Sequence, residues 1–457
     1  MNGNKKVRRK DLGKESIWKL LGEMAIPAAV AMIVNGLYNV VDTMFVGQGV
    51  GSFAIGGLNI IFPVQMFSVA IGGLIGMGGA SIVSRSLGHN DIEKANNTAG
   101  NAFIVSLILG IVFITLISIF MEPLLRFLGA VENNYQYAYD YLYFIRFGLV
   151  FIFMTIAGTS LVRAEGHSKT AMIIMASGTI SNIILDPIFI FALDMGIQGA
   201  ALATVLSRGL STVLLILYFF SGRSQLTIVL HNLKLKTNII KEKFALGGAT
   251  FFRQMTVSFL VVIMNNSLSY YGSDIHQSVY GITIKLVGFL LMPMFGIVQG
   301  FQPIAGFNYG AGKPDRVRKA IKYSIISTIV VATTMFLGLM IFSESVLRIF
   351  ADDPRLIKEG ILPLRIVIIF FPVVGIHLIG AAFFQSIGKA IPSIFLSLCR
   401  HILFLIPLVT ILPLFFDLMG LWISFPIADF LATIAALIGI KIELGKPNMQ
   451  VVENPAA

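Results

Sequence analysis

Long apolar segments recur from one end of this chain to the other, and this recurrence constrains the fold more than any other feature. A hydrophobic helix of about 20 residues crosses the hydrocarbon core of a bilayer. About twelve segments meet this criterion, near 20–47, 53–84, 98–121, 134–160, 168–193, 196–220, 243–271, 278–309, 317–342, 356–386, 390–415 and 418–441. Charged residues make up 12% of the chain, whereas about 25% is usual in soluble domains. The sequence therefore predicts an all-α membrane protein with twelve transmembrane helices.

Lysine and arginine residues are concentrated in alternate loops. One set of loops holds Arg85, Lys94, Arg163, Lys169, Arg223, Lys234, Lys236, Lys241, Lys243, Lys313, Arg316, Arg318, Lys319, Lys322 and Lys389, and both ends of the chain are also basic. The opposite loops hold only Arg126, Arg348, Arg355 and Lys358. The positive-inside rule then places both termini in the cytoplasm. The net charge of +11 is a topology signal and does not indicate a nucleic-acid partner.

Three pairs of segments repeat at a nearly constant spacing of 222 to 225 residues. They are 84-SRSLGHNDIEKA-95 with 307-FNYGAGKPDRVRKA-320, 163-RAEGHSKTAMI-173 with 385-QSIGKAIPSIF-395, and 193-LDMGIQGA-200 with 416-FDLMGLWIS-424. The repeat predicts a parallel duplication of two homologous six-helix lobes around a central cavity. The predicted parts are a cytoplasmic basic N-terminus (1–19), a first lobe (20–220), a cytoplasmic connector (221–242), a second lobe (243–441) and a cytoplasmic tail (442–457). Two homologous lobes suit alternating access, which favours a secondary transporter.

The stretch 181-SNIILDPIFIF-191 places a carboxylate and a proline inside an apolar run. Asn182 lies one helical turn before Asp186 and is positioned to donate to its carboxylate. Pro187 removes the backbone donor that would pair with the carbonyl of Ile183. The stretch thus predicts a cluster at membrane depth that can hold a proton, water or Na⁺. The alternative is that Asp186 only joins two helices through Asn182, and Thr204 of the sixth span either adds a hydroxyl or serves helix packing.

The first span carries the other candidate carboxylate, Asp42. Asn35, Tyr38 and Asn39 precede it by seven, four and three residues, which is one helical face. This polar stripe is predicted to face the cavity, unless Asp42 merely reaches the membrane surface near its helix end. Pro27 lies about fifteen residues before Asp42 and is predicted to act as a hinge, although a passive kink fits as well. Pro187 is the other hinge candidate.

Further charged residues lie within the predicted spans of the second lobe. Lys285 lies deep in its span and is expected to line the substrate cavity, where it either pairs with a carboxylate or repels cations. Asp429 is a third carboxylate inside a span, but it belongs to no recognisable motif. Near span ends, the guanidinium groups of four arginines are expected to extend to the membrane surface: Arg146, Arg208, Arg365 and Arg400.

The motifs together resemble those of the multidrug and toxic compound extrusion (MATE) transporters, over nearly the whole chain. The resemblance lies in 27-PAAVAMIVNGLYNVVDTMFVG-47, 84-SRSLGHNDIEKA-95, 177-SGTISNIILDPIFI-190, 196-GIQGAALATVLSR-208 and 302-QPIAGFNYGAGKPDRVRKA-320. It is strongest to the DinF-like and MepA-like members. It implies a proton or cation site, with Na⁺ as a candidate, at four residues: Asp42, Asn182, Asp186 and Thr204. It also implies that Asn35 and Tyr38 line the cavity wall.

One departure from the family concerns the second lobe. The similar NorM-type members also use acidic residues in the seventh and tenth spans. Here those spans read 251-FFRQMTVSF-259 and 366-IVIIFFPVVGIHLIG-380, which contain no carboxylate. The resemblance therefore does not extend to an ion site in the second lobe.

The sequence and the resemblance together predict an antiporter of a prokaryotic plasma (inner) membrane that exports cationic or amphiphilic organic compounds in exchange for H⁺ or Na⁺. The expected partners are these compounds and membrane lipid, with no nucleic acid, no cofactor beyond the coupling ion, and a monomeric state. The alternative is a flippase for lipids or lipid-linked precursors, which would need a basic cavity; Lys285 and Arg253 leave this open. An intramembrane enzyme is not expected, because the chain has no HExxH or DxxxD-like spacing and no glycine-rich phosphate loop.

Overall fold

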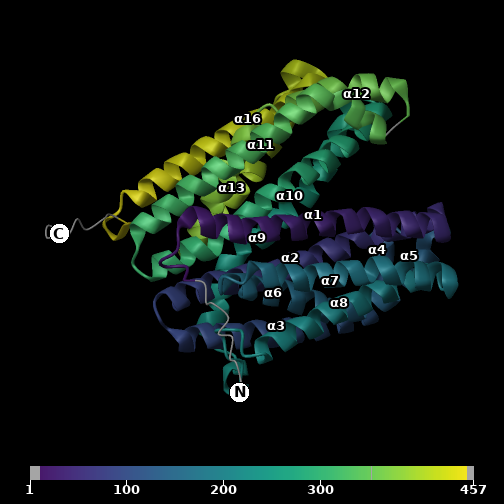
Figure 1. Cartoon of the computed structure of the whole chain (residues 1–457). Helices are drawn as coiled ribbons and strands as arrows, with labels where there is room; N and C mark the ends of the chain where they lie inside the picture. Colours follow the sequence, from purple (N-terminus) through teal and green to yellow (C-terminus); the bar gives the residue numbers. More distant parts are fainter. Residues whose placement is uncertain (1–10, 351, 450–457) are drawn as a thin grey trace. The chain divides into compact units, whose positions relative to one another are not determined.

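The computed structural model describes residues 11–350 and 352–449, without the side chains of Ser52 and Asn448. Within these residues the secondary structure is helical and contains no strand (Figure 1). Eleven helices are long and apolar enough to cross a membrane, and a pair of helices bent by 48°, Pro354–Val367 and Phe371–Ser386, forms a twelfth span. This confirms the predicted all-α fold. Parts of the predicted N-terminus (1–10) and tail (450–457) lie outside the described residues.

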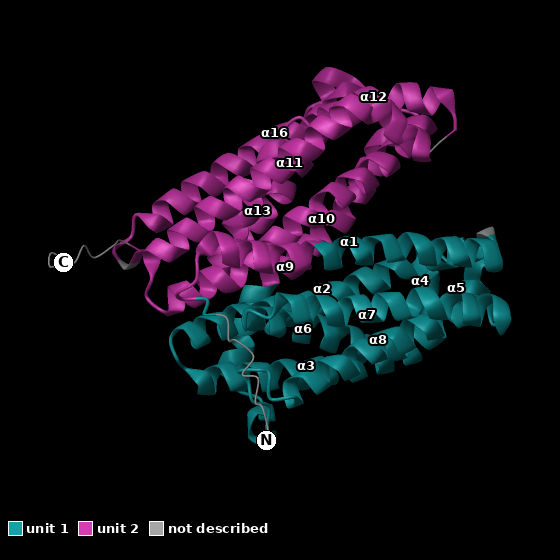
Figure 2. Ribbon diagram, viewed as in Figure 1, with its two compact units in different colours: residues 1–12, 30–247 teal, residues 13–29, 248–457 magenta. Residues whose placement is uncertain are grey.

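The helices form two compact units, shown in separate colours in Figure 2. Unit 1 consists, among the described residues, of 11–12 and Val30–Gly247, and unit 2 of Gly13–Ala29 with the described residues from Gly248 onward. The units differ from the predicted lobes in two places. The start of the first helix belongs to unit 2, and the start of the seventh span belongs to unit 1.

Unit 1 contains the first six spans after Ala29. It comprises α1 (Ile17–Gly49) from Val30 onward, α2 (Ser52–Gly88), α3 (Ile92–Ile119), α4 (Met121–Phe127), α5 (Glu132–Ile145), η1 (Arg146–Gly148), α6 (Leu149–Ala164), α7 (Ser168–Pro187), η2 (Ile188–Ala192), α8 (Gly196–Phe220), η3 (Leu230–Leu233) and the start of α9 (Thr237–Tyr271). α5, η1 and α6 make one span, Glu132–Ala164. The carboxylate of Asp91 caps α3 by accepting from the Lys94 amide at 2.9 Å.

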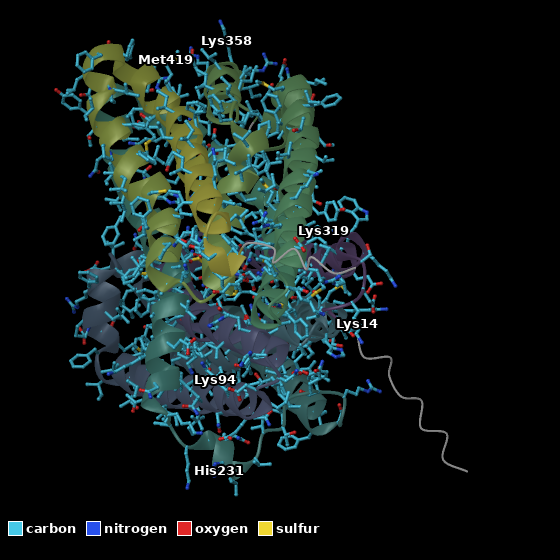
Figure 3. The ribbon with its side chains drawn as sticks, turned by 90° about the vertical axis from the view of Figure 1, so that its left-hand side faces the viewer. Lys14, Lys94, His231, Lys319, Lys358 and Met419 are labelled. Carbon is cyan, nitrogen blue, oxygen red and sulfur yellow. The ribbon has the colours of Figure 1, made fainter. Side chains whose placement is uncertain are left out.

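Unit 2 contains the rest of α9 and the later spans. These are α10 (Asp274–Gly310), α11 (Pro314–Phe350), α12 (Pro354–Val367), α13 (Phe371–Ser386), α14 (Ala390–Leu398), η4 (Cys399–Leu405), α15 (Ile406–Ile411), α16 (Pro413–Leu444) and η5 (Pro447–Met449). A buried apolar cluster around Trp422 and Phe425 joins α9, α10 and α16. Within this unit, Lys358 and Met419 lie at one end and Lys319 at the other (Figure 3). Loops predicted to face opposite sides of the membrane are thus separated by the length of the helices.

The backbone repeats the duplication seen in the sequence. Left-handed backbone conformations occur in pairs at Gly166 and Gly388, with φ of 88° and 85°, and at Asp194 and Asp417, with φ of 53° and 47°. α7 and α14 also begin 222 positions apart, at Ser168 and Ala390. Positions in the two halves can therefore be compared by this spacing.

Two tight helix crossings explain why the first helix of each half joins the other unit. In unit 1, a Cβ on Gly78 of α2 would lie 2.0 Å from the Lys243 carbonyl oxygen, and one on Gly247 of α9 would lie 1.9 Å from the Leu74 carbonyl oxygen. In unit 2, a Cβ on Gly300 of α10 would lie 2.7 Å from the amide nitrogen of Ala25 in α1. Small residues let membrane helices approach this closely.

The two crossings are related by the duplication. Gly78 and Gly300 are 222 positions apart, and so are Ala25 and Gly247. Each crossing therefore joins the first helix of one half to the second helix of the other half.

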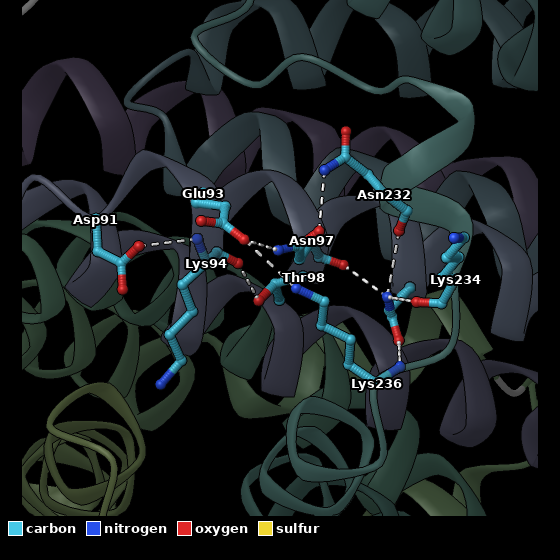
Figure 4. A network of polar contacts seen from close by, with 9 residues as sticks. Asp91, Glu93, Lys94, Asn97, Thr98, Asn232, Lys234 and Lys236 are labelled. Carbon is cyan, nitrogen blue, oxygen red and sulfur yellow. Dashed lines mark hydrogen bonds and ion pairs between the residues drawn. The ribbon is translucent and has the colours of Figure 1, made fainter.

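The predicted connector is fastened to unit 1 (Figure 4). Asn101 of α3 is fully buried; its amide donates to the carbonyl oxygens of Asn232 and Lys234 at 3.3 and 2.9 Å, and its side-chain oxygen accepts from the Lys236 amide at 2.9 Å. The Asn232 side chain in turn donates to that of Asn97 at 2.9 Å. α9 begins at Thr237, so the segment between the helices ends about six residues earlier than the predicted boundary at 242.

Candidate functional site

The stretch around Pro187 forms a deformed helix that buries a carboxylate. α7 runs to Pro187 and continues as the π-helical η2, in which the Leu193 amide donates to the Ile188 carbonyl at 2.9 Å. The π-helical turn follows directly after the proline, whose ring is incompatible with a regular helix. Asp186 is fully buried, and Asn182 donates to it at 3.1 Å, as the i, i+4 spacing predicts.

Residues from three helices converge on this carboxylate. Asp42 of α1 is 8% exposed, and its carboxyl group lies within hydrogen-bonding reach of that of Asp186. Thr204 of α8 accepts from Asn182 at 3.4 Å and lies 3.4 Å from the Tyr38 hydroxyl. The structure thus brings together the four residues predicted for the ion site: Asp42, Asn182, Asp186 and Thr204. It adds Tyr38, which the sequence placed at the wall of the cavity.

Sequence reasoning missed two further polar residues beside this site. The Tyr141 hydroxyl of α5 is within hydrogen-bonding reach of Thr204 and accepts from Gln65 of α2 at 3.0 Å. Tyr141 is 1% exposed. It stands in the tyrosine-rich run 135-YQYAYDYLY-143, where nothing in the sequence distinguishes it from its neighbours. Only the packing of α5 against α2 and α8 selects it.

Several buried oxygen atoms of the site have no hydrogen-bond partner among the described residues. One oxygen each of Asp42, Asn182 and Asp186 is buried without a hydrogen-bond partner among the described residues. A buried polar atom left unpaired costs about 1–3 kcal/mol, so an arrangement with three of them favours a proton, water or a cation. Two carboxyl groups within hydrogen-bonding reach can bond to each other only if one of them carries a proton. Oxygen atoms of this kind are also the ligands that hard cations prefer.

A small pocket with room for about one water molecule adjoins these residues. It is lined by Tyr38, Gly178, Thr179, Asn182, Thr204, Ser207 and Arg208. Pockets for drug-sized ligands have volumes of about 300–1,000 Å³. The pocket therefore suits an ion with water better than an organic substrate.

Other predicted site residues lie outside this cluster. Asn39 is exposed and donates to the Asn35 carbonyl at 2.9 Å, so the predicted stripe divides into a buried pair, Tyr38 and Asp42, and two residues that do not enter the site. Lys285 is exposed on α10. Pro27 lies inside the continuous helix α1, two residues before the boundary between the units. The role of Lys285 in a cavity and that of Pro27 as a hinge remain predictions.

The prediction that the guanidinium group of Arg400 extends to the membrane surface is wrong. Its guanidinium group forms an ion pair with Asp429, which is only 4% exposed, and also donates to His401 at 3.0 Å. The reason is that Asp429 lies on the neighbouring helix α16, where a buried carboxylate attracts the arginine more strongly than the membrane surface does. In the same unit the guanidinium of Arg253 stacks on the Phe295 ring, 5.1 Å from its centroid.

Two helical units of one ancestry, with a buried carboxyl pair among membrane-spanning helices, define this protein as an integral membrane transporter. The MatE family matches residues 27–188 and 249–411, one segment in each half. The chain belongs to the MatE family, as the motifs indicated.

Individual relatives agree with this assignment. The chain is 25% identical over 424 residues to the multidrug export protein MepA of Staphylococcus haemolyticus, covering 93% of both chains. The MATE multidrug transporter DinF-BH, solved in complex with a small-molecule ligand, is 37% identical and superposes with a TM-score of 0.88, covering 96% of this chain and 98% of that one. An outward-facing multidrug resistance MATE transporter of the MOP superfamily is 26% identical, with a TM-score of 0.90 over 95% of this chain and 98% of that one. The expected resemblance to DinF-like and MepA-like members is confirmed.

Proposed function

We propose that this transporter is an antiporter that exports cationic or amphiphilic organic compounds in exchange for H⁺ or Na⁺. The observation that carries the proposal is the buried group of Asp42, Asp186 and Asn182 in unit 1. Its two carboxyl groups lie together, and three of its oxygens have no partner among the described residues.

This geometry supports an exchange of cations at one site. Burial favours the protonated form of a carboxyl group, and a second carboxylate beside it adds repulsion that a proton relieves. A cationic compound or Na⁺ nearby favours the ionised pair and expels the proton. Proton and cation would thus exclude each other, which is the requirement for antiport.

The membrane potential supplies free energy for this exchange when the exported compound carries no charge. One elementary charge crossing the membrane contributes about 2.3 kcal/mol per 100 mV. That sustains a roughly 50-fold gradient of a neutral substrate. One exchanged proton is then sufficient for effective export, whereas a singly charged cation exchanged for one proton moves no net charge and depends on the H⁺ or Na⁺ concentration gradient.

The names of the relatives support organic compounds as substrates, since MepA is a multidrug export protein and the DinF-BH structure holds a small-molecule ligand. The pocket beside Asn182 is small, so we place the coupling ion there and the substrate elsewhere. The alternating basic loops support a location in a prokaryotic plasma membrane with both termini in the cytoplasm. We further propose that the protein acts as a monomer.

The test is efflux of a fluorescent lipophilic cation from everted vesicles, driven first by a pH gradient and then by a Na⁺ gradient. Asp42→Asn and Asp186→Asn are each expected to abolish gradient-driven transport while the protein inserts normally. Asp140→Asn is the matched control, because its carboxylate is only half-buried and accepts from Gln136 at 3.0 Å, outside the site.

The gradient that drives wild-type efflux identifies the coupling ion. If both site variants transport like the wild type, the carboxylates are structural and the proposal is wrong. The same vesicles loaded with a labelled lipid then test the flippase alternative.

A further inference from the structure

Unit 2 contains a buried pair of opposite charges that the proposed transport cycle does not use. Arg400 of η4 and Asp429 of α16 form an ion pair. The carboxylate is 4% exposed and the arginine side chain 18% exposed. A carboxyl group buried this deeply among membrane helices either takes up a proton or pairs with a cation, and here a cation is present.

The duplication shows what stands at the corresponding position in unit 1. Arg400 corresponds to Gly178, 222 positions earlier, by the same spacing that relates Ser168 to Ala390. Gly178 lies on α7 and lines the small pocket beside Asn182 and Thr204. Unit 1 therefore has a glycine beside a small pocket at the position where unit 2 has an arginine.

The helices that face these two residues also correspond. A Cβ on Gly178 would lie 2.0 Å from the Ser211 hydroxyl of α8. Arg400 instead faces Asp429 of α16, in the part of that helix after its break at Asp417; this part corresponds to α8, which follows Asp194. In unit 1 the two helices are in close contact at a glycine, whereas in unit 2 an ion pair joins the corresponding helices.

His401 fixes the position of the guanidinium group. Arginine has only donors, so the nitrogen of His401 that lies 3.0 Å from Arg400 must be an acceptor. His401 is accordingly the neutral tautomer with its proton on Nδ1. Asp429 and the neutral ring thus form a receptor for a planar cation with several N–H donors.

We propose that unit 2 contains a cation site of guanidinium type, formed by Asp429 and His401, whose occupant is the tethered side chain of Arg400. The tether makes the occupant non-exchangeable, so Asp429 holds no coupling ion. This leaves Asp42 and Asp186 as the carboxyls that exchange, a consequence that rests on the proposed function.

The site is tested by removing the tether and supplying the free cation. Arg400→Ala is prepared as the full-length protein in detergent, and its thermal unfolding midpoint is measured with increasing guanidinium chloride at millimolar concentrations. We expect a lower midpoint than in the wild type, and a rise that saturates as guanidinium binds. Neither urea, which has a similar shape but no charge, nor potassium chloride at equal ionic strength should raise it.

Comparison with three other proteins decides the outcome. The wild type and the double variant Arg400→Ala/Asp429→Asn should show no saturable rise, because the first site is filled and the second lacks its carboxylate. Arg400→Lys keeps a tethered cation and should also fail to respond. An equal response of the wild type or the double variant, or an equal effect of potassium, overturns the proposal.

The experiment remains decisive if Arg400→Ala cannot be purified as a folded protein. Recovery of the double variant but not of Arg400→Ala then supports the site, because the single change strands a buried carboxylate. Loss of both overturns it. None of these measurements uses transport, so a failure of the proposed antiport leaves them interpretable.

Discussion

Replacing Gly247 by alanine is a sensitive test of the helix crossing in unit 1. The added Cβ would lie 1.9 Å from the carbonyl oxygen of Leu74, whereas Cβ atoms essentially never approach within 3.0 Å of another atom. The atom that it meets belongs to the backbone of α2, so no side-chain rotation relieves the clash. α9 and α2 must therefore separate locally by about 1 Å, which opens gaps in close-packed surroundings.

The expected cost follows from two opposing effects. Overpacking of a well-packed interior typically costs about 1–3 kcal/mol. Alanine is a better helix former than glycine by about 1 kcal/mol. A crossing of two backbones has little freedom to adjust, so we take the upper part of the range and expect a net loss of about 2 kcal/mol.

The assay is thermal unfolding of the purified protein in detergent. A loss of about 2 kcal/mol lowers the midpoint by roughly 4–8 °C if each unit unfolds separately. Gly281→Ala is the matched control, because it makes the same change within α10, where a Cβ meets nothing within 4 Å; its midpoint should stay constant or rise. If Gly247→Ala is as stable as Gly281→Ala, the backbones are not in contact and the reasoning fails.

Three further predictions concern other parts of the chain. Burial raises the pKa of Glu165, which follows α6, from 4.5 to about 7. The folded protein therefore binds this proton more tightly than the unfolded one, and stability should fall by about 3 kcal/mol as the pH rises from 4.5 to 7. In Glu165→Gln this component of the pH profile should vanish, and a retained slope assigns it to another group. Asn101→Ala leaves the buried carbonyl and amide groups of the connector without hydrogen bonds, at a cost of about 3 kcal/mol, and should speed proteolysis within 221–236. Asn96→Ala is the control, because it loses one bond to the Thr227 amide and should have little effect. Equal cleavage of the two variants contradicts this prediction. Pro27→Ala should reduce transport without affecting insertion if the proline is a hinge, and unchanged efflux excludes that role.

The parts of the fold that the sequence predicted are those set by local patterns. Apolar length predicted the spans, and the spacing of Asn182, Asp186 and Pro187 predicted a donor, an acceptor and a deformed helix within one stretch. The contacts that it missed join helices far apart in the chain. Arg400 meets a carboxylate 29 residues away on another helix, and Tyr141 differs from neighbouring tyrosines only by the helices that surround it. Periodicity describes one helix at a time and does not specify which faces meet.

The start of the first helix of each half belongs to the unit formed mainly by the other half, and this has a consequence for the insertion of the protein into the membrane. Ala25 leaves the ribosome long before Gly300 of α10, against which it packs and which is translated 275 residues later. The start of α1 must therefore wait in the membrane without its partner while the six spans between α1 and α10 are inserted. During this interval its small residues are open to wrong pairings, and loops that must close over such long separations form slowly. Nor does a cut in the connector yield two complete halves, because each fragment would lack the helix start that the other carries.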